Sequence, residues 1–418
     1  MAQYDVVVVG LGATGAAALR ELARRGFRVL GLERFTPGHE QGSSHGETRI
    51  IRLGYFEHPS YVPLLRRSYE LWRELEADSG RKLMRVTGIV EIGMPIGPLV
   101  RGTLAAVREH DLQHEILDGH ETMRRFPAFR IPGDFVGVLQ PDGGFLAAET
   151  AVEVLVSMAR AANAEIRTGV HVLSVAPNGS GVRIKTSGGE IEARTAIVAA
   201  GHWLTELIPD LPAPLRATRE VMAWFKPRDP APFAPGSFPV FILESRHGMH
   251  YGFPMSPAGT VKIAKHHHHN ETVFPGDPRR PPNEADEMLI RSAITSYIPP
   301  ADGPLVEAKT CVYTMTPDHD FIIDRLPGAP NIVVASPCSG HGFKVAPVIG
   351  EVLAIYIDER FIADGIVQTG AMRPLARLGY MDYAVISPES LFTLNRPTAS
   401  SDGRSATVLP GAWDGVYR

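Results

Sequence analysis

The sequence predicts an α/β protein in which a Rossmann-like nucleotide-binding domain, assembled from separate stretches of chain, carries an inserted antiparallel-sheet domain. Three observations lead to this fold class. A β-branched apolar run, a glycine-rich turn and a helix-forming segment open the chain. From about residue 219 to 316, short alternating runs broken by Pro and Gly indicate an antiparallel sheet. Parallel-sheet patterning then returns with "NIVVAS" and the helical segment "VAPVIGEVLAIYI".

Composition excludes several classes of function. A formal net charge of -4 without a long basic run argues against a nucleic-acid or anionic-membrane partner. No apolar run approaches the roughly 20 residues of a membrane span. The start, "MAQYDVVVVG", has the pattern of a strand and not of a signal peptide, and two cysteines cannot form a disulfide framework. We therefore expect a cytoplasmic protein, and 418 residues predict more than one domain.

The amino terminus carries a dinucleotide-binding motif in its full context. A predicted strand is followed by "GLGATG", with Gly10 for a tight turn, Gly12 for close approach of a pyrophosphate and Gly15 for helix–strand packing. The helix "AAALRELARR" offers free N–H groups to the phosphates. A second strand, "FRVLGLE", ends at Glu33, which can accept hydrogen bonds from ribose hydroxyls. An acid at this position favours FAD or NAD over NADP.

Periodicity predicts the elements that follow. Helices are expected at 60–77, 103–110 and 148–162, and strands at 84–94 and in "GVHVLSVAP", "VRIKTS", "IEARTAIVAAG", "EVMAWFKP", "PVFILES", "MHYGFP" and "TVKIAKH". The strand that ends at Gly201 allows close approach of backbone to a ligand.

These elements divide the chain into two domains and a tail. We assign 1–83, 146–218 and 317–396 to the nucleotide-binding domain, 84–145 and 219–316 to the substrate domain, and 397–418 to a flexible or surface-docked tail.

Five separated blocks carry a resemblance to a known family. They are "GSSHGETRIIRLGYFEHPSYVPL" at 42–64, "YGFP" at 251–254, "KIAKH" at 262–266, "KTCVYTMTPDHDFIID" at 309–324 and "SGHGFK" at 339–344. In order and approximate spacing they resemble the monomeric sarcosine oxidases and N-methyltryptophan oxidases, from about Tyr4 to "LNRP" at 394–397. That family is a branch of the D-amino-acid-oxidase flavoprotein fold. Its members oxidise secondary amines with FAD and reduce oxygen to peroxide.

The resemblance implies a cofactor and its attachment. It implies FAD, bound covalently through Cys311, which falls where the family attaches the 8α carbon of the flavin. Such attachment needs a thiolate, whose formation nearby cations favour. Composition alone favours the alternative, in which Cys311 is a small buried hydrophobe. Cys338 does not match the attachment motif, and we interpret it as a packing residue, whereas Gly342 of "SGHGFK" is expected beside the cofactor.

The same resemblance implies the substrate site. Arg52 and Lys344 are similar to the two cations that hold a substrate carboxylate, with a surface salt bridge as the alternative for Arg52. Lys262 corresponds to the lysine that activates oxygen, which on its own would be an ordinary strand lysine. His45 and Arg49 match residues at the flavin face or edge. Tyr251, Tyr313 and His266 match positions that line the pocket, with structural roles as the alternative.

The run of four histidines from His266 to His269 suggests a metal site only superficially. Successive strand side chains point to opposite faces, and no nearby Cys or acid completes a usual zinc spacing. We therefore expect no metal. The extra residues between Asp358 and Leu391 and the tail beyond Pro397 depart from the family pattern, and we expect them either to cap the pocket or to mediate self-association. The first of these segments either leaves room for a ligand larger than sarcosine or only covers the outside of the domain.

The predicted function is oxidation of a secondary amine that bears a carboxylate, by a monomer whose partners are an amino acid and oxygen. Self-association through 359–390 or the tail is an alternative. Three other functions stay open: an oxidase of a cyclic amino acid related to proline or pipecolate, an NAD-dependent dehydrogenase, and a non-catalytic FAD-binding protein.

Overall fold

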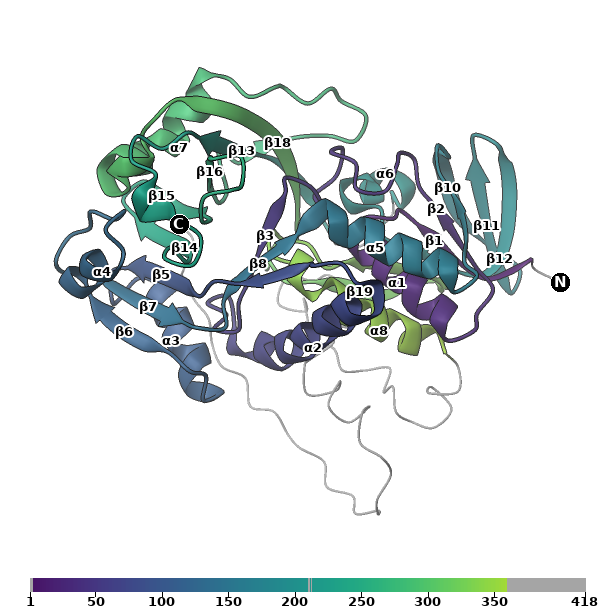
Figure 1. Ribbon diagram of the computed structural model, residues 1–418. Coiled ribbons are helices and arrows are strands. Elements are labelled where there is room, and N and C mark those ends of the chain that lie inside the picture. The colour runs from purple at the N-terminus through teal and green to yellow at the C-terminus, as the bar shows by residue number, and fades with distance from the viewer. Residues whose placement is uncertain (1–2, 210, 212, 359–418) are drawn as a thin grey trace, which may run out of the picture.

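The computed structural model describes residues 3–209, 211 and 213–358. The extra segment at 359–390 and the tail at 397–418, to which the sequence analysis gave roles, lie outside the described residues. Figure 1 shows two sheet-based halves that meet along the strands β3 and β8.

The described elements follow one another in this order. The first half of the chain forms β1 (Tyr4–Val9), α1 (Ala13–Arg24), β2 (Val29–Leu32), β3 (Thr48–Ile51), η1 (Pro59–Tyr61), α2 (Val62–Ser79), β4 (Met84–Val86), β5 (Ile89–Gly93), α3 (Pro98–Glu109), β6 (Glu115–Asp118), α4 (Gly119–Arg125), β7 (Val136–Gln140), β8 (Gly144–Ala147), α5 (Ala148–Ala161), β9 (Glu165–Arg167), β10 (Val172–Asn178), β11 (Gly181–Thr186) and β12 (Gly189–Val198). The second half forms η2 (Gly201–Trp203), α6 (Leu204–Leu207), β13 (Arg216–Phe225), η3 (Ala231–Phe233), β14 (Val240–Ser245), β15 (Gly248–Gly252), β16 (Val261–Lys265), β17 (Glu271–Thr272), α7 (Glu284–Tyr297), η4 (Pro299–Ala301), β18 (Leu305–Met315), β19 (Ile322–Leu326), β20 (Ala329–Ser336), η5 (Phe343–Val345) and α8 (Ala346–Ile357).

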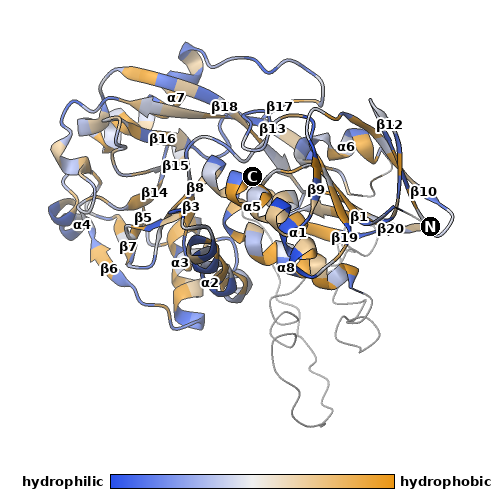
Figure 2. Cartoon of the chain, turned by 45° about the vertical axis from the view of Figure 1, so that its right-hand side comes forward, coloured by the Kyte–Doolittle hydropathy of each residue, from blue (hydrophilic) through white to orange (hydrophobic). Residues whose placement is uncertain are grey.

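The first sheet is the predicted Rossmann-like unit. Its strands run in the order β10-β11-β12-β1-β2-β9, with β20 beside β12 and β19 beside β20. The central strand β1 pairs in parallel with both β12 and β2, and its residues are almost all buried. Because both faces of a parallel sheet are covered, its strands are continuously apolar, which Figure 2 shows for the strands around β1.

Helices α1, α5 and α8 lie together against this sheet (Figure 1). Their contact depends on small residues, since a Cβ at Gly350 of α8 would lie 2.7 Å from the backbone of Ala17 in α1. This close packing fixes the amino-terminal end of α1 at the carboxyl ends of the strands.

The second sheet contains nine strands in the order β17-β13-β16-β15-β14-β5-β7-β6, with β18 along β13. It is antiparallel as predicted except where β14 pairs with β5 in parallel. That exception arises because β5 enters the sheet from a distant stretch of chain. The long β13–β18 pair sets Thr218 opposite Tyr313 and Glu220 opposite Cys311.

Two predicted elements need correction. The single strand expected at 84–94 is two strands, β4 in a three-stranded sheet with β3 and β8 and β5 in the second sheet. Gly88, with a φ of 73°, makes the turn between them. Helix α3 begins at Pro98, five residues before the predicted start, because Pro is favoured in a first helical turn. Gly102 inside it meets the Phe56 backbone, where a Cβ would be 2.1 Å from the carbonyl oxygen.

None of the helices within residues 3–358 that the structure describes is long and apolar enough to cross a membrane.

Candidate cofactor and substrate site

Two adjoining cavities lie beside each other, the first at the carboxyl ends of strands of the first sheet and the second between that region and the second sheet. The first cavity encloses about 1020 Å³ and is lined by the glycine-rich turn, the end of β2 and the 199–203 segment. The second encloses about 1120 Å³ and is lined by β3, by strands of the second sheet and by the 337–344 loop. Ala13, Thr14, Ser43, Ser44 and Cys338 line both cavities, so the two spaces share one wall.

Glycines make the first cavity possible. Gly10 has a φ of 88°, and a Cβ there would lie 2.7 Å from the carbonyl oxygen of Ala199. A Cβ on Gly15 would lie only 1.8 Å from the carbonyl oxygen of Gly10. Gly10, Gly12 and Gly201 all line this cavity, whereas Gly15 packs behind Gly10. The backbone therefore presents a concave, side-chain-free surface at the start of α1.

Glu33 lies on the wall of the same cavity at the end of β2. Its Oε2 accepts the Leu11 N–H at 2.8 Å and its Oε1 accepts the Phe35 N–H at 2.9 Å. Burial opposes ionisation of this carboxyl, but the bonds from His39, Phe35 and Leu11 outweigh burial and hold its pKa below the usual value. An ionised acid is thus held in place at the position predicted for ribose recognition.

The shared wall suits a pyrophosphate. Ala13 and Thr14, the first residues of α1, line both cavities; the N-cap residue Gly12 has no side chain, and the Ala13 N–H donates to Ser44 Oγ at 3.1 Å. A helix amino terminus favours negative charge through its free N–H groups. A nucleotide half on one side and a flavin half on the other would place the linking phosphates there, so the two cavities fit a dinucleotide such as FAD.

The second cavity brings together most of the residues predicted for substrate and flavin. Its wall includes the predicted residues Arg49, Arg52, Tyr251, His266, Cys311, Tyr313, Gly342 and Lys344. They come from β3, β15, the end of β16, β18 and the 337–344 loop.

Arg52 is buried and already paired. Its Nη2 lies 2.6 Å from Glu57 Oε2, its Nη1 donates to the Gly54 carbonyl at 2.6 Å, and its Nε lies 3.5 Å from Glu91 Oε1. The alternative considered for Arg52, a salt bridge at the surface, is therefore wrong, because the residue is buried and only 2% exposed. Burial raises the pKa of Glu91 to about 7, even though Arg52 acts in the opposite direction.

Lys344 lies beside Arg52 in the same wall. Its Nζ donates to the His341 carbonyl at 2.8 Å and approaches Tyr55 Oη at 3.4 Å. Burial and then the charge of Arg52 lower the pKa of Lys344 to about 7, against the pull of Glu57 and Glu91. This end of the cavity holds the buried Arg52 and, below about pH 7, a second buried cation in Lys344, which is a suitable environment for a carboxylate.

Cys311 lies in the cavity wall with cationic and carbonyl neighbours. Its Sγ is 3.6 Å from Arg49 Nη2 and 3.8 Å from the Ser43 carbonyl oxygen. Cys338, interpreted from the sequence as a packing residue, also lines both cavities, and burial raises the pKa of its thiol.

His45 and Lys262 are buried near these walls but do not line either cavity. Lys262 Nζ donates to the Gly46 carbonyl at 2.6 Å and the Thr48 carbonyl at 2.9 Å. Burial, with Arg49 close by, lowers the pKa of Lys262 well below its usual value. Neither ring nitrogen of His45 has a hydrogen-bond partner among the described residues.

Three acids near the site were missed by the sequence analysis: Glu57, Glu91 and Glu220. Glu57 lies inside a recognised block, but nothing local says that it pairs with Arg52. Glu220 lies two residues before Met222 on β13, so both side chains are on the same face of the strand and both line this cavity. That strand alternation is the signal by which the sequence could have indicated Glu220.

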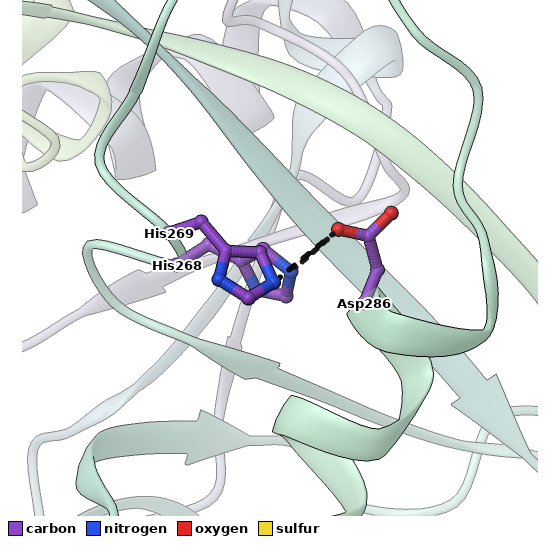
Figure 3. Close-up of side chains that lie close together, drawn as sticks. All are labelled: His268, His269 and Asp286. Carbon is purple, nitrogen blue, oxygen red and sulfur yellow. Dashed lines mark hydrogen bonds and ion pairs between the residues drawn. The ribbon is translucent and has the colours of Figure 1, made fainter.

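The histidine run does meet an acid. A turn in which His267 and Asn270 have positive φ lets His268 and His269 approach Asp286 of α7, and the three ligand atoms lie within 4.8 Å of one another (Figure 3). Asp286, however, binds Arg219 through both oxygens, at 2.9 and 2.8 Å, and Arg280 at 3.1 Å. Two guanidinium groups on the only carboxylate oppose a cation, so this cluster is an ion-pair network.

Comparisons with known proteins agree with this geometry. The FAD dependent oxidoreductase (DAO) family model matches residues 5–355. A monomeric sarcosine oxidase of Streptomyces avermitilis is 38% identical over 356 residues, 84% of this chain and 92% of that protein. An N-methyl-L-tryptophan oxidase of Salmonella agona is 35% identical over 353 residues, 84% of this chain and 94% of that protein.

Solved structures extend the likeness to the whole fold. NikD, described as an unusual amino acid oxidase essential for nikkomycin biosynthesis, matches with a TM-score of 0.76 at 26% identity, covering 93% of this chain and 99% of NikD. A glycine oxidase from Geobacillus kaustophilus shares the fold with a TM-score of 0.72 at 20% identity, covering 90% of this chain and 98% of that chain. The predicted resemblance is confirmed, and this chain belongs to the FAD-dependent oxidoreductase family with the D-amino-acid-oxidase fold.

Proposed function

We propose that the protein is an FAD-dependent oxidase of amino acids whose amine is secondary, such as sarcosine or a larger N-methyl amino acid. The observation that carries the proposal is the pair of buried cations, Arg52 and Lys344, on the wall of the second cavity. They stand at the positions where the resemblance predicts a carboxylate anchor. The relatives named as sarcosine oxidase and N-methyl-L-tryptophan oxidase support the same class of substrate.

The residues have distinct proposed tasks. Bound FAD supplies the two-electron oxidation of the carbon–nitrogen bond and passes those electrons, with two protons, to oxygen to form peroxide. Arg52 and Lys344 hold the substrate carboxylate, which fixes the orientation of the oxidised carbon. Tyr251, Tyr313 and His266 shape the cavity and exclude water. The imine product reacts with water to give an amine and an aldehyde, formaldehyde when the nitrogen carried a methyl group.

The first cavity is proposed to hold the nucleotide half of FAD. Gly10, Gly12 and Gly201 leave room for the backbone to approach the cofactor, with Gly15 supporting Gly10, and Glu33 accepts the ribose hydroxyls. Gly342, on the wall of the second cavity, is proposed to lie beside the flavin half of FAD. A cation at Lys262 favours negative charge that develops on oxygen, and Arg49 and His45 act near the flavin.

We further propose that Cys311 attaches the flavin covalently. Cys311 lines the second cavity, and its sulfur lies 3.6 Å from Arg49 Nη2, at the position where the resemblance predicts attachment. Acid precipitation tests this directly, because covalent flavin stays with the chain and free flavin stays in the supernatant. The variant Cys311→Ala is expected to release the colour. All flavin in the supernatant of the wild-type protein contradicts attachment while leaving the oxidase proposal intact.

A peroxide-release screen tests the function itself. N-methyl amino acids, cyclic amino acids related to proline and pipecolate, and added nicotinamide cofactor form its three arms. We expect turnover in the first arm without nicotinamide. Turnover only of cyclic substrates would replace the proposed substrate class, and a coloured protein that no amine reduces would indicate a non-catalytic flavin carrier. Sedimentation of the same sample tests the expected monomer.

A further inference from the structure

An acid stands in the wall of the second cavity without a charged partner. On the face of the second sheet that meets this cavity, Glu220 is paired across β13 and β18 with Cys311. On its other side Glu220 faces the turn that follows β16, where the His268 N–H donates to its carboxylate. Met249, His266, Glu220 and Cys311 all line the cavity. Glu220 therefore lies on the cavity wall directly across the strand pair from the proposed flavin anchor.

The contacts of Glu220 come from neutral donors. Its Oε1 accepts the Thr218 hydroxyl at 2.9 Å, and its Oε2 accepts the His268 N–H at 2.9 Å. Within the part of the chain that the structure describes, no basic group forms an ion pair with it. Lys265 and Arg219 both attract this carboxylate, but Lys265 Nζ donates to the His268 carbonyl at 3.1 Å and Arg219 binds Asp286 at 2.8 Å. Glu57, the other acid of this cavity, is by contrast paired with Arg52.

The fold does not require a charge at this position. A glutamine could accept the His268 N–H through its carbonyl oxygen and donate its amide to the Thr218 hydroxyl. A buried carboxylate without a cation is costly, and burial raises the pKa of Glu220 to about 7. The negative charge of Glu220 also contributes to the raised pKa values of Tyr251 and Tyr313, after burial, so it acts on two further residues of the wall.

We propose that Glu220 is a specificity-determining residue that binds a positively charged nitrogen on the substrate, remote from the carboxylate held by Arg52 and Lys344. The cavity then has a cationic end and an anionic wall, and it selects amino acids with a basic side chain. This inference rests on the proposed function, because it takes Arg52 and Lys344 as the carboxylate anchor. A ligand cation would supply the charge that Glu220 lacks, and a desolvated charge pair of this kind is a strong determinant of specificity.

Matched pairs of ligands that cannot be oxidised test the proposal. Purified protein is titrated by calorimetry with ω-amino carboxylic acids of three to six carbons and with the unsubstituted acids of the same lengths. We expect one chain length at which the ammonium compound binds at least about tenfold more tightly than its partner. Glu220→Gln should abolish that preference and leave binding of the unsubstituted acids within about twofold. The control Glu307→Gln, which removes an exposed acid from the same sheet, should retain it.

A second variant guards against a trivial loss of structure. Glu220→Asp keeps the charge on a shorter side chain and is expected to retain an ammonium preference, moved to a longer ligand. The inference is overturned if no chain length prefers the ammonium in the wild-type protein, or if Glu220→Gln keeps the preference. It is also overturned if Glu220→Gln weakens both members of a pair equally, because Glu220 would then only maintain the shape of the cavity or contact the cofactor. Failure of the unsubstituted acids to bind contradicts the carboxylate anchor and thus the proposed function itself.

Discussion

The two cavities are built in different ways. The first is formed mainly by backbone, with Gly10, Gly12 and Gly201 on its wall and the amino terminus of α1 at its end. The second is formed by side chains from distant segments, among them the ion pair of Arg52 and Glu57. In the proposed function, the first cavity binds the phosphates that many nucleotide cofactors share, and the second binds the groups that distinguish one substrate from another.

This difference has a consequence for tolerance to substitution. At Gly10 and Gly15 the turn fails when a side chain is added, because a Cβ would meet backbone atoms, which cannot move aside as the end of a side chain can. The second cavity is instead sensitive to removal of one member of a buried ion pair, because the other member is then left as a buried charge without a partner. The predictions below probe these two modes of failure, from the largest expected effect to the smallest.

The largest effect is expected at Gly15, which packs behind the glycine turn of the first cavity. Gly15→Val places side-chain atoms where even a Cβ would be 1.8 Å from the carbonyl oxygen of Gly10. We expect almost complete loss of folded, flavin-containing protein, measured by soluble yield and visible absorbance. Gly188→Ala is the matched control, since the nearest atom to its Cβ would be the Thr186 hydroxyl at 3.9 Å. A normally coloured Gly15→Val protein would show that α1 does not pack as described.

The next largest effect is expected when the Arg52 side chain is removed. Arg52→Ala leaves Glu57 and Glu91 without their cation, and truncating one member of a buried pair costs about 2–5 kcal/mol. Carboxylate inhibitors should bind at least about tenfold more weakly, measured by titration of the flavin absorbance. Arg52→Met combined with Glu57→Gln should recover thermal stability without recovering binding. If the double variant binds normally, the anchor lies elsewhere.

A pH dependence follows from Lys344. Its pKa of about 7 is depressed from the usual lysine value, so the side chain is charged below that pH and neutral above it. A bound carboxylate favours the charged form, and affinity should therefore fall by up to about tenfold for each pH unit above 7. Titrations from pH 6 to 9 measure this slope, which Lys344→Met should flatten. An unchanged slope in Lys344→Met would instead implicate Glu91, whose pKa is also about 7.

The smallest effect is expected at Glu57. In the structure its carboxylate occupies the fork of Arg52, so an incoming carboxylate competes with it. Glu57→Gln should tighten carboxylate binding severalfold at pH 5, well below the pKa of Lys344, because removal of Glu57 lowers that pKa further. Inhibitor titration at that pH provides the measurement. Weaker binding would mean that Glu57 supports the orientation of Arg52 and does not compete for it.

The two cavities also differ in how far the sequence predicts them. The strand, glycine turn and helix of the first cavity are local in the chain, so their pattern alone indicates a nucleotide site. The mixed α/β fold and the family were likewise predictable, from five separated blocks. The break at Gly88 was missed because "RVTGIVEIG" alternates across both strands.

What the sequence does not reveal are pairings between distant segments. Arg52 with Glu91 and Asp286 with His268 depend on which strands and helices become neighbours. Glu220 is adjacent to recognised residues only across the sheet, and its lack of a cation is a property of the folded chain. The roles assigned to Lys262 and His45 remain predictions, since both are buried beside the cavities and not on their walls.

The most direct test of the proposed carboxylate anchor compares an amino acid with the same amine lacking its carboxylate. Purified protein is titrated without oxygen with sarcosine and with dimethylamine, and with N-methyltryptophan and N-methyltryptamine, while the flavin absorbance is followed. We predict that at least one amino acid bleaches the flavin and that its decarboxylated partner does not do so at the same concentration. Equal bleaching by acid and amine would contradict a carboxylate anchor at Arg52 and Lys344, and with it the assigned substrate class.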